Sequence, residues 1–142
     1  MPSIHDLETP SVLIDLDRLE RNIARMSERA REAGVRLRPH AKTHKIPEIG
    51  WMQVRAGAVG LSLAKTSEAE VFAKHGFTDL FVAYPVVSPA KAERLVALSR
   101  RVKLCVGVDS VHGASMLGEA ASRAGVSLRV SLKVDCGFHR VG

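Results

Sequence analysis

Aromatic residues and cysteines are scarce in this sequence of 142 residues, and each shortage argues against a class of protein. Aromatic residues make up 4% of the chain. None interleaves with its main basic cluster, which argues against a platform that stacks single-stranded nucleic acid. The two cysteines, Cys105 and Cys136, fit no metal-ligand spacing. They are expected to be reduced thiols of a cytoplasmic protein.

Long apolar runs are also missing. None approaches the roughly 20 residues that a membrane-spanning helix needs. The N-terminus, MPSIHDLETPS, carries acids and lacks the apolar core of a secretory signal. We therefore predict a cytoplasmic protein with no membrane partner. The net charge of +6 is compatible with nucleic acid, an acidic partner or a phosphorylated ligand, and does not choose among them.

Amphipathic segments alternate with short apolar segments along the chain. The stretch DLDRLERNIARMSERAREAG carries one apolar stripe of a helix, with Asp15 or Asp17 as its cap and Gly34 at its end. A later helix is expected to open with a capping box formed by Ser67 and Glu70. Strands are expected to start near residues 35, 58, 79, 102 and 128.

Strict alternation predicts an α/β protein with a parallel sheet covered by helices. Two architectures fit this order. A five-stranded doubly wound sheet would be complete within 142 residues. A (β/α)8 barrel of the TIM type needs about 250 residues, so the chain would supply only its first five strands.

Two of the expected strands carry a polar face, and these faces favour the incomplete barrel. The first strand, within RLRPHAKTHK, places on one side Arg36, Arg38, His40, Lys42 and His44. The last strand places on one side Arg129, Ser131, Lys133 and Asp135. A charged row fits a barrel interior, where polar groups from several strands can pair, better than it fits a layer of covering helices.

Lys42 is the candidate reactive group, because reactive side chains of a parallel α/β barrel sit at the carboxyl ends of its strands. Neighbouring cations and burial both disfavour an ammonium ion, so this lysine could act as a Schiff-base nucleophile. His40 and His44 flank it in positions suited to proton transfer. The alternative is a basic strand that pairs with carboxylates elsewhere. Lys45 is expected to point away into solvent.

Three stretches, TPSVLIDLDRLERNIARM, RLRPHAKTHK and KVDCGFHRVG, resemble the N-terminal barrel of the fold-type III pyridoxal-phosphate enzymes. The nearest likeness is to the D-threonine aldolase and D-serine dehydratase group, also called D-serine deaminase-like, and alanine racemase is a more distant relative. The resemblance implies that residues 1–15 form an N-terminal segment with a lead strand, SVLIDL. Residues 16–142 would form the N-terminal part of the barrel. The last barrel strands and a C-terminal β-domain would lie outside this sequence.

The same resemblance assigns the site. Lys42 matches the lysine that forms a Schiff base with pyridoxal 5′-phosphate. His40 and Arg140 would also contact the cofactor, with Arg140 near its pyridine hydroxyl oxygen, and Arg38 and His44 are possible supports. No metal ligand is expected in this chain. Full-length relatives are expected to bind a divalent metal through residues of their C-terminal part.

The function implied by the resemblance is that of a pyridoxal-phosphate-dependent lyase acting on small D-hydroxy-amino acids. The reaction would be D-serine dehydration or D-threonine aldol cleavage, and full-length relatives are expected to be homodimers. The chain alone is expected to have little or no activity, because a partial barrel has open edges. The alternatives are a non-catalytic pyridoxal-phosphate carrier, a small doubly wound binding domain and a basic nucleic-acid module. The lack of aromatic residues in the basic cluster disfavours the last of these.

Overall fold

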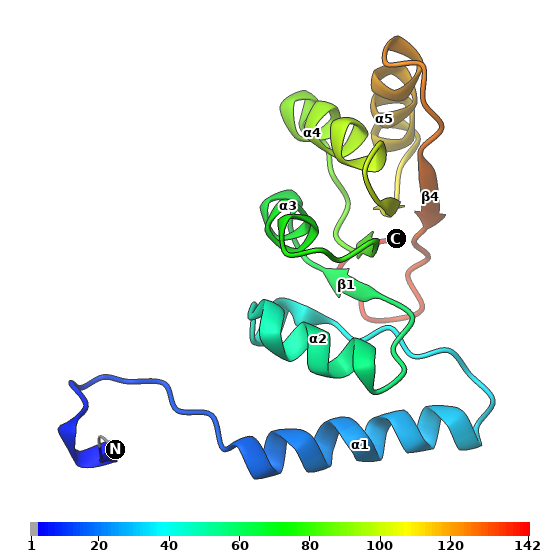
Figure 1. Cartoon of the computed structure of the whole chain (residues 1–142). Coiled ribbons are helices and arrows are strands. Elements are labelled where there is room, and N and C mark those ends of the chain that lie inside the picture. Colours follow the sequence, from blue (N-terminus) through cyan, green and yellow to red (C-terminus); the bar gives the residue numbers. More distant parts are fainter. Residues whose placement is uncertain (1–2) are drawn as a thin grey trace.

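A single parallel sheet forms the centre of the computed structural model, which describes residues 3–142 (Figure 1). Its strands lie in the order β1 (Leu61–Leu63), β2 (Asp79–Val82), β3 (Lys103–Val108) and β4 (Arg129–Leu132). The α-helices are α1 (Leu16–Glu32), α2 (Pro47–Arg55), α3 (Thr66–Lys74), α4 (Pro89–Ser99) and α5 (Val111–Arg123). Two short 3-10 helices are η1 (Ile4–Asp6) and η2 (Ala41–Thr43). Within the described residues, no helix is long and apolar enough to cross a lipid bilayer.

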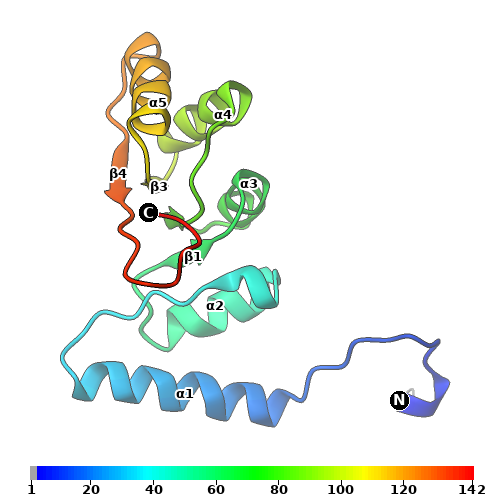
Figure 2. The ribbon, with the colours of Figure 1, turned by 180° about the vertical axis from the view of Figure 1, so that it is seen from behind.

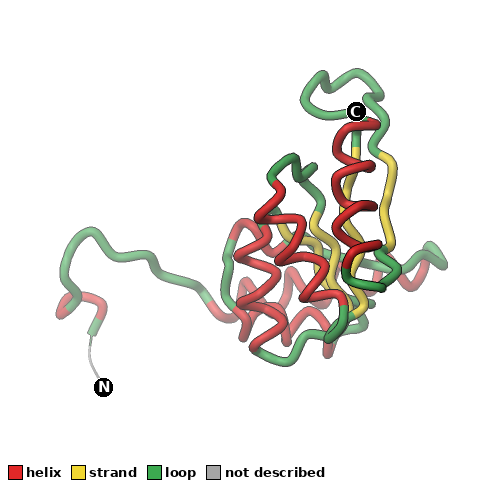
Figure 3. The backbone as a smooth tube through the Cα atoms, turned by 90° about the horizontal axis from the view of Figure 1, so that it is seen from above, coloured by secondary structure: helices red, strands yellow, loops and turns green. Residues whose placement is uncertain are grey.

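The strand order decides between the two expected architectures. Consecutive strands are neighbours throughout and all pairs are parallel, and helices α3, α4 and α5 lie along the same side of the sheet (Figures 1 and 3). A doubly wound sheet reverses its strand order at a switch point and is covered on both faces. A barrel adds each strand beside the previous one and keeps its helices outside. The prediction of an incomplete barrel is confirmed, and the doubly wound alternative is wrong.

Alternate strand residues point towards the helices and form the core. These outer-face side chains are buried and apolar: Leu61, Leu63, Leu80, Val82, Leu104, Val106 and Val108. Each of the three covering helices contributes at least one large, fully buried side chain to this cluster: Phe72, Leu95, Val96 and Leu117. The outer face is therefore closed over β1 to β3.

The opposite face of the sheet carries a row of residues of mixed polarity. We call it the inner row; its members are partners in the strand register: His40, Ser62, Phe81, Cys105 and Arg129. Helices α3, α4 and α5 cover the outer side, and the segment that follows β4 runs back on the inner side towards β1 (Figure 2). The polar face expected for β4 is confirmed, because Arg129 and Ser131 pair with Cys105 and Gly107 of the inner side.

The first expected strand is an extended segment rather than a regular strand. Residues 35–39 run beside β1, where the Leu37 carbonyl accepts a hydrogen bond from the Val59 N–H at 2.9 Å and the Pro39 carbonyl accepts one from the Ser62 N–H at 2.8 Å. A single parallel bridge joins His40 to Ser62. Pro39 has no N–H to donate, and the chain enters η2 directly after His40, so a full ladder cannot form.

The expected lead strand, SVLIDL, is not a strand in this structure. Residues 11–15 have no regular secondary structure, and Val12 is 96% exposed. A strand needs a hydrogen-bonded neighbour, and among residues 3–142 none lies beside this segment. Helix α1 begins at Leu16, where the Asp15 carboxylate accepts a hydrogen bond from the Arg18 N–H at 2.9 Å. The division of the chain at residues 15 and 16 stays a prediction.

The start of α3 also differs from its expected form. The helix begins at Thr66 with Lys65 as its cap residue, two positions before the expected cap Ser67. The Ser67–Glu70 capping box does not form, because Glu70 pairs instead with Arg94 of α4. Glu68 instead binds the backbone just before the helix, where its carboxylate accepts a hydrogen bond from the Ala64 N–H at 2.8 Å.

The closed outer face predicts a steep cost for truncation of a central core residue. Leu80 is 0% exposed, so Leu80→Ala is expected to lower the free energy of unfolding by about 2–5 kcal/mol. Leu132 lies on the same side of the sheet but is 71% exposed, and Leu132→Ala is expected to change it by less than about 0.5 kcal/mol. Urea unfolding followed by circular dichroism measures both. Equal losses for the two variants would contradict the core described above.

Candidate active site

The Lys42 side chain is presented by a short turn at the carboxyl edge of the sheet. His40, the first member of the inner row, is the cap residue of η2, and its Nδ1 accepts a hydrogen bond from the Lys42 N–H at 3.2 Å. Ala41 is fully buried and anchors the turn. Lys42 itself is exposed. Because β1 runs parallel to this segment and ends at Leu63, the lysine lies at the end where a barrel carries its reactive groups.

Charged groups surround the His40 ring. Burial lowers the pKa of His40 below 6.5, and the charge of Lys42 lowers it further. The carboxylate of Glu68 opposes this by raising the pKa, while Arg140 and Lys133 lower it. His40 is therefore neutral near pH 7. Since its Nδ1 is a hydrogen-bond acceptor, the proton of the neutral ring lies on Nε2.

Arg140 comes from the other end of the chain. It follows β4 in the returning segment, and its guanidinium lies 5.3 Å from the centroid of the Phe138 ring. The loop before it is held by Asp135, whose carboxylate accepts hydrogen bonds from the Gly137 N–H at 2.9 Å and the His139 N–H at 3.0 Å. These hydrogen bonds lower the pKa of Asp135. The charge of Arg140 lowers the pKa of His40, so the two residues lie within electrostatic range of each other.

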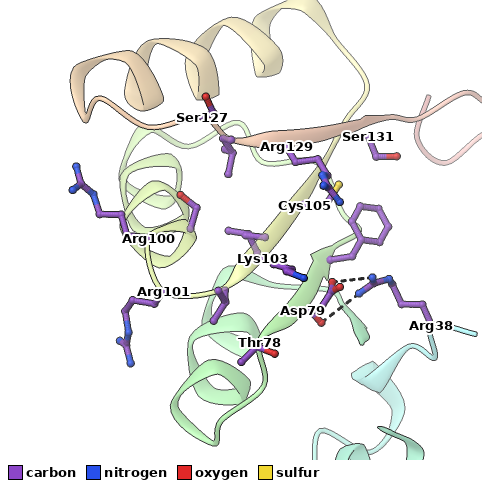
Figure 4. Close-up of a pocket in the computed structure, with 15 residues that line it drawn as sticks. Arg38, Thr78, Asp79, Arg100, Arg101, Lys103, Cys105, Ser127, Arg129 and Ser131 are labelled. Atoms are coloured by element: carbon purple, nitrogen blue, oxygen red, sulfur yellow. Dashed lines mark hydrogen bonds and ion pairs between the residues drawn. The ribbon is translucent and has the colours of Figure 1, made fainter. Parts of the chain in front are cut away.

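Arg38 lies towards the amino end of the sheet. Its guanidinium forms an ion pair with the Asp79 carboxylate at 2.8 Å and donates to the Asp79 carbonyl at 3.3 Å (Figure 4). Gly60 leaves room for this contact, because a Cβ there would collide with both groups. Arg38 thus ties the extended segment to β2.

His44 lies on the outer side of the turn, so the structure does not place it beside Lys42. It lines a cavity of about 280 Å3 between α1 and α2, together with Leu19 and Gln53. Its Nδ1 accepts a hydrogen bond from the Ile46 N–H at 3.0 Å, and burial lowers its pKa. The expected alternation placed His40 and His44 on one face. The 3-10 turn between them breaks the period of two that a strand would impose.

A cavity of about 890 Å3 lies along the inner face, away from Lys42 (Figure 4). Its wall includes Thr78, Val102 and Ser127, which come just before or at the start of strands β2, β3 and β4. Cationic side chains in its wall belong to Arg38, Arg100, Arg101, Lys103 and Arg129. This hollow is at the amino end of the sheet, whereas a parallel barrel carries its chemistry at the carboxyl end.

The sequence interpretation missed an ion pair near Lys42, between Lys45 and Glu68. The Nζ of Lys45, which was expected to be solvated, lies 3.4 Å from the Oε1 of Glu68. The Glu68 side chain is only 10% exposed. Glu68 stands three positions into a helix, where a glutamate usually faces solvent, so its residue type gave no signal of burial.

Metal ligands are not grouped in this part of the chain. Over residues 3–142, no three side chains of His, Cys, Asp or Glu lie together in an arrangement that could hold a metal ion. The side chains around the Lys42 turn offer an exposed amine, a neutral imidazole, a guanidinium and the carboxylate of Glu68.

The fold and site define a parallel α/β barrel segment that presents a lysine at its carboxyl edge. The alanine racemase N-terminal domain family matches residues 14–142, so the chain belongs to that family. The sequence is 40% identical to a D-threonine aldolase of an Arthrobacter species over 96% of this chain and 36% of that protein. It is 35% identical to the D-serine dehydratase of Dictyostelium discoideum, over 98% of this chain and 37% of that protein.

A solved structure shows the same fold. The crystal structure of a D-threonine aldolase from Filomicrobium marinum superposes with a TM-score of 0.94 at 40% identity, covering 98% of this chain and 38% of that one. The chain thus spans little more than a third of the length of the relatives it matches. The likeness to the fold-type III enzymes of the aldolase and dehydratase group is confirmed for this part.

The burial of His40 and the charges around it predict a fold that loses stability in acid. The folded-state pKa of His40 lies below 6.5, so at pH values between the two pKa values the unfolded chain binds more protons than the folded chain. Stability is then lost as the pH falls below 6.5 and levels off below the folded-state pKa. An NMR titration of the His40 ring gives this pKa directly. In Lys42→Ala the midpoint is expected to rise, because one repelling charge is gone; a wild-type midpoint at or above 6.5 would contradict the described site.

Proposed function

We propose that the protein is a pyridoxal-phosphate-dependent lyase that acts on small D-hydroxy-amino acids and attaches its cofactor at Lys42. The observation that carries the proposal is the exposed Lys42 amine at the carboxyl edge, beside a neutral histidine and within a group of cations. The named relatives, an aldolase and a dehydratase, support this class of substrate.

The residues at the edge fit the cofactor. An aldehyde requires a free amine, and among residues 3–142 the Lys42 side chain forms no ion pair. The cofactor is an anion and requires positive charge, which Lys133 and Arg140 supply near His40. When bound, the cofactor withdraws electrons from the substrate carbon next to the amino group.

The roles of the chain's own residues follow from their chemistry. The Lys42 amine is placed to hold or return a proton at the substrate Cα. The neutral His40 ring fixes the Lys42 turn through its Nδ1 and has its Nε2–H free to donate. Arg140 can donate hydrogen bonds to an oxygen of the cofactor ring. Dehydration and aldol cleavage differ in the bond that breaks next, and groups beyond these three would decide between them.

The unpaired edge of β4 supports the proposal of a larger protein. Among residues 3–142, no helix covers the outer side of β4, and Val130 and Leu132 are 47% and 71% exposed. We propose that further strands and a β-domain complete the barrel and provide the rest of the phosphate site. The ligands of a divalent metal would also lie outside residues 3–142. A cytoplasmic location and a homodimer of the complete protein stay predictions.

Removal of the Lys42 amine provides the test of the proposed function. With any residues that its reading frame carries beyond Gly142, the protein is expected to bind pyridoxal phosphate, to show a visible absorption band and to be fixed to the cofactor by borohydride at Lys42. Lys42→Ala should lose both the band and the trapped adduct. Lys74→Ala, at an exposed lysine of α3, should keep them.

Turnover then separates catalysis from storage of the cofactor. Release of pyruvate from D-serine, or of glycine from D-threonine, by the wild-type protein supports the lyase. Trapping at Lys42 without turnover of any D-hydroxy-amino acid would favour a non-catalytic carrier. Absence of trapping would refute the proposal.

The exposed edge also predicts the behaviour of the 142-residue chain by itself. An unpaired strand with apolar side chains associates with other chains. Leu132→Lys is therefore expected to reduce concentration-dependent association, measured by light scattering. Val87→Lys, at a loop position that is 61% exposed, is the matched control and should have a smaller effect. Equal effects of the two substitutions would show that β4 is not the associating edge.

A further inference from the structure

We infer that Glu68 is a positioning residue for the Lys42 turn, because its buried carboxylate holds Lys45 and the end of β1 together. The inference rests on the proposed role of Lys42. It assigns to Glu68 no contact with substrate or cofactor. Its effect is on the place and rigidity of the turn that carries the amine.

The first support is the burial of the Glu68 carboxylate. The side chain is 10% exposed, and a buried carboxylate is unfavourable unless it is paired. Its Oε2 accepts a hydrogen bond from the Ala64 N–H at 2.8 Å, directly after β1. Its Oε1 forms no hydrogen bond within the described residues, and the Lys45 ammonium lies 3.4 Å away. The charge of Lys45 is therefore the main compensation for this oxygen.

The second support is the backbone of Lys45. Its φ is 56°, in the left-handed region that residues with a Cβ seldom adopt. Its N–H donates to the Ala41 carbonyl at 2.8 Å, which closes the turn around Lys42. Such a conformation persists only where the surroundings hold it. The ion pair with Glu68 is a contact that holds the side chain of this same residue.

The third support is electrostatic. The charged groups that influence the His40 ring are Lys42, Glu68, Arg140 and Lys133. Glu68 is the carboxylate among them, and it raises the pKa of His40 against three cations. Glu68 thus affects the geometry of the Lys42 turn through Lys45, and it also affects the charge around His40.

A matched control lies on the same helix. Glu70 of α3 forms an ion pair with Arg94 of α4, where both side chains are much more exposed than that of Glu68. An exposed ion pair contributes little to stability. Glu70→Gln therefore removes a carboxylate and an ion pair from α3 while leaving the Lys42 turn untouched.

The experiment measures the turn locally and the cofactor separately. In Glu68→Gln, amide hydrogen exchange at Lys45 is expected to be about tenfold faster, the factor that loss of one charged interaction corresponds to. The NMR midpoint of His40 should fall further below 6.5. In the cofactor-loaded protein, the dissociation constant for pyridoxal phosphate should rise about tenfold for the same reason. Glu70→Gln should change none of these by more than about twofold.

Variants of Lys45 keep the test decisive if Glu68→Gln fails to fold. Lys45 is 55% exposed on its side chain, so Lys45→Gln is expected to fold and to reproduce faster exchange at position 45. Lys45→Arg, which keeps the charge, should restore most of the protection. The double variant Glu68→Gln with Lys45→Gln should be no worse than Glu68→Gln alone, since the two residues act as a pair.

Three outcomes of these experiments would overturn the inference. They are additive effects in the double variant, a neutral Lys45→Gln, and equal exchange in Glu68→Gln and Glu70→Gln. Because hydrogen exchange needs no cofactor, this outcome is separate from the proposed function. If Lys42 is not trapped by borohydride, the proposed function fails even where Glu68 still protects the turn.

Discussion

Two backbone hydrogen bonds determine where the reactive end of this chain lies. They run from Val59 to the Leu37 carbonyl and from Ser62 to the Pro39 carbonyl, and they align the extended segment with β1. Because the alignment is parallel, the residues after Pro39 come to the same edge as the ends of the strands. Everything at the site depends on this: the turn of η2, the exposure of Lys42 and the nearness of His40 to residues that follow β4.

The balance of charge at that edge is the second determinant. Burial lowers the pKa of His40, three nearby cations lower it further, and one carboxylate raises it. A positively charged imidazole would add to the repulsion, so the neutral form is favoured by both effects. A group of cations with few carboxylates is an unfavourable arrangement without an anion, and it suits a phosphorylated ligand.

Much of the fold could be read from the sequence because periodicity reports burial. The apolar positions of Leu80, Val106 and Leu117 follow the periods of their elements, and the structure buries them. The position of Lys42 could be predicted for the same reason, as the end of a segment with alternating polarity. His44 could not, since the change from an extended segment to a 3-10 turn after Pro39 moves it to the other side.

The Glu68–Lys45 ion pair could not be predicted from the sequence, for a different reason. Both residues belong to types that are usually solvated, and they come from two elements that meet only through the fold. Their link depends on a left-handed backbone at a lysine, which no propensity would suggest. Interactions of this kind follow from tertiary geometry and leave no periodic trace in either segment.

The sequential order of the strands has a consequence for how the chain acquires its structure. Every strand pairs with the one before it, so each new unit docks on a surface that already exists, and the loops to be closed are short. Proteins whose contacts are close in sequence fold quickly. The core between β1 and β3 can therefore consolidate before β4 docks on its edge. In a sheet of this order, folding can begin with the first pairs of strands and extend one strand at a time.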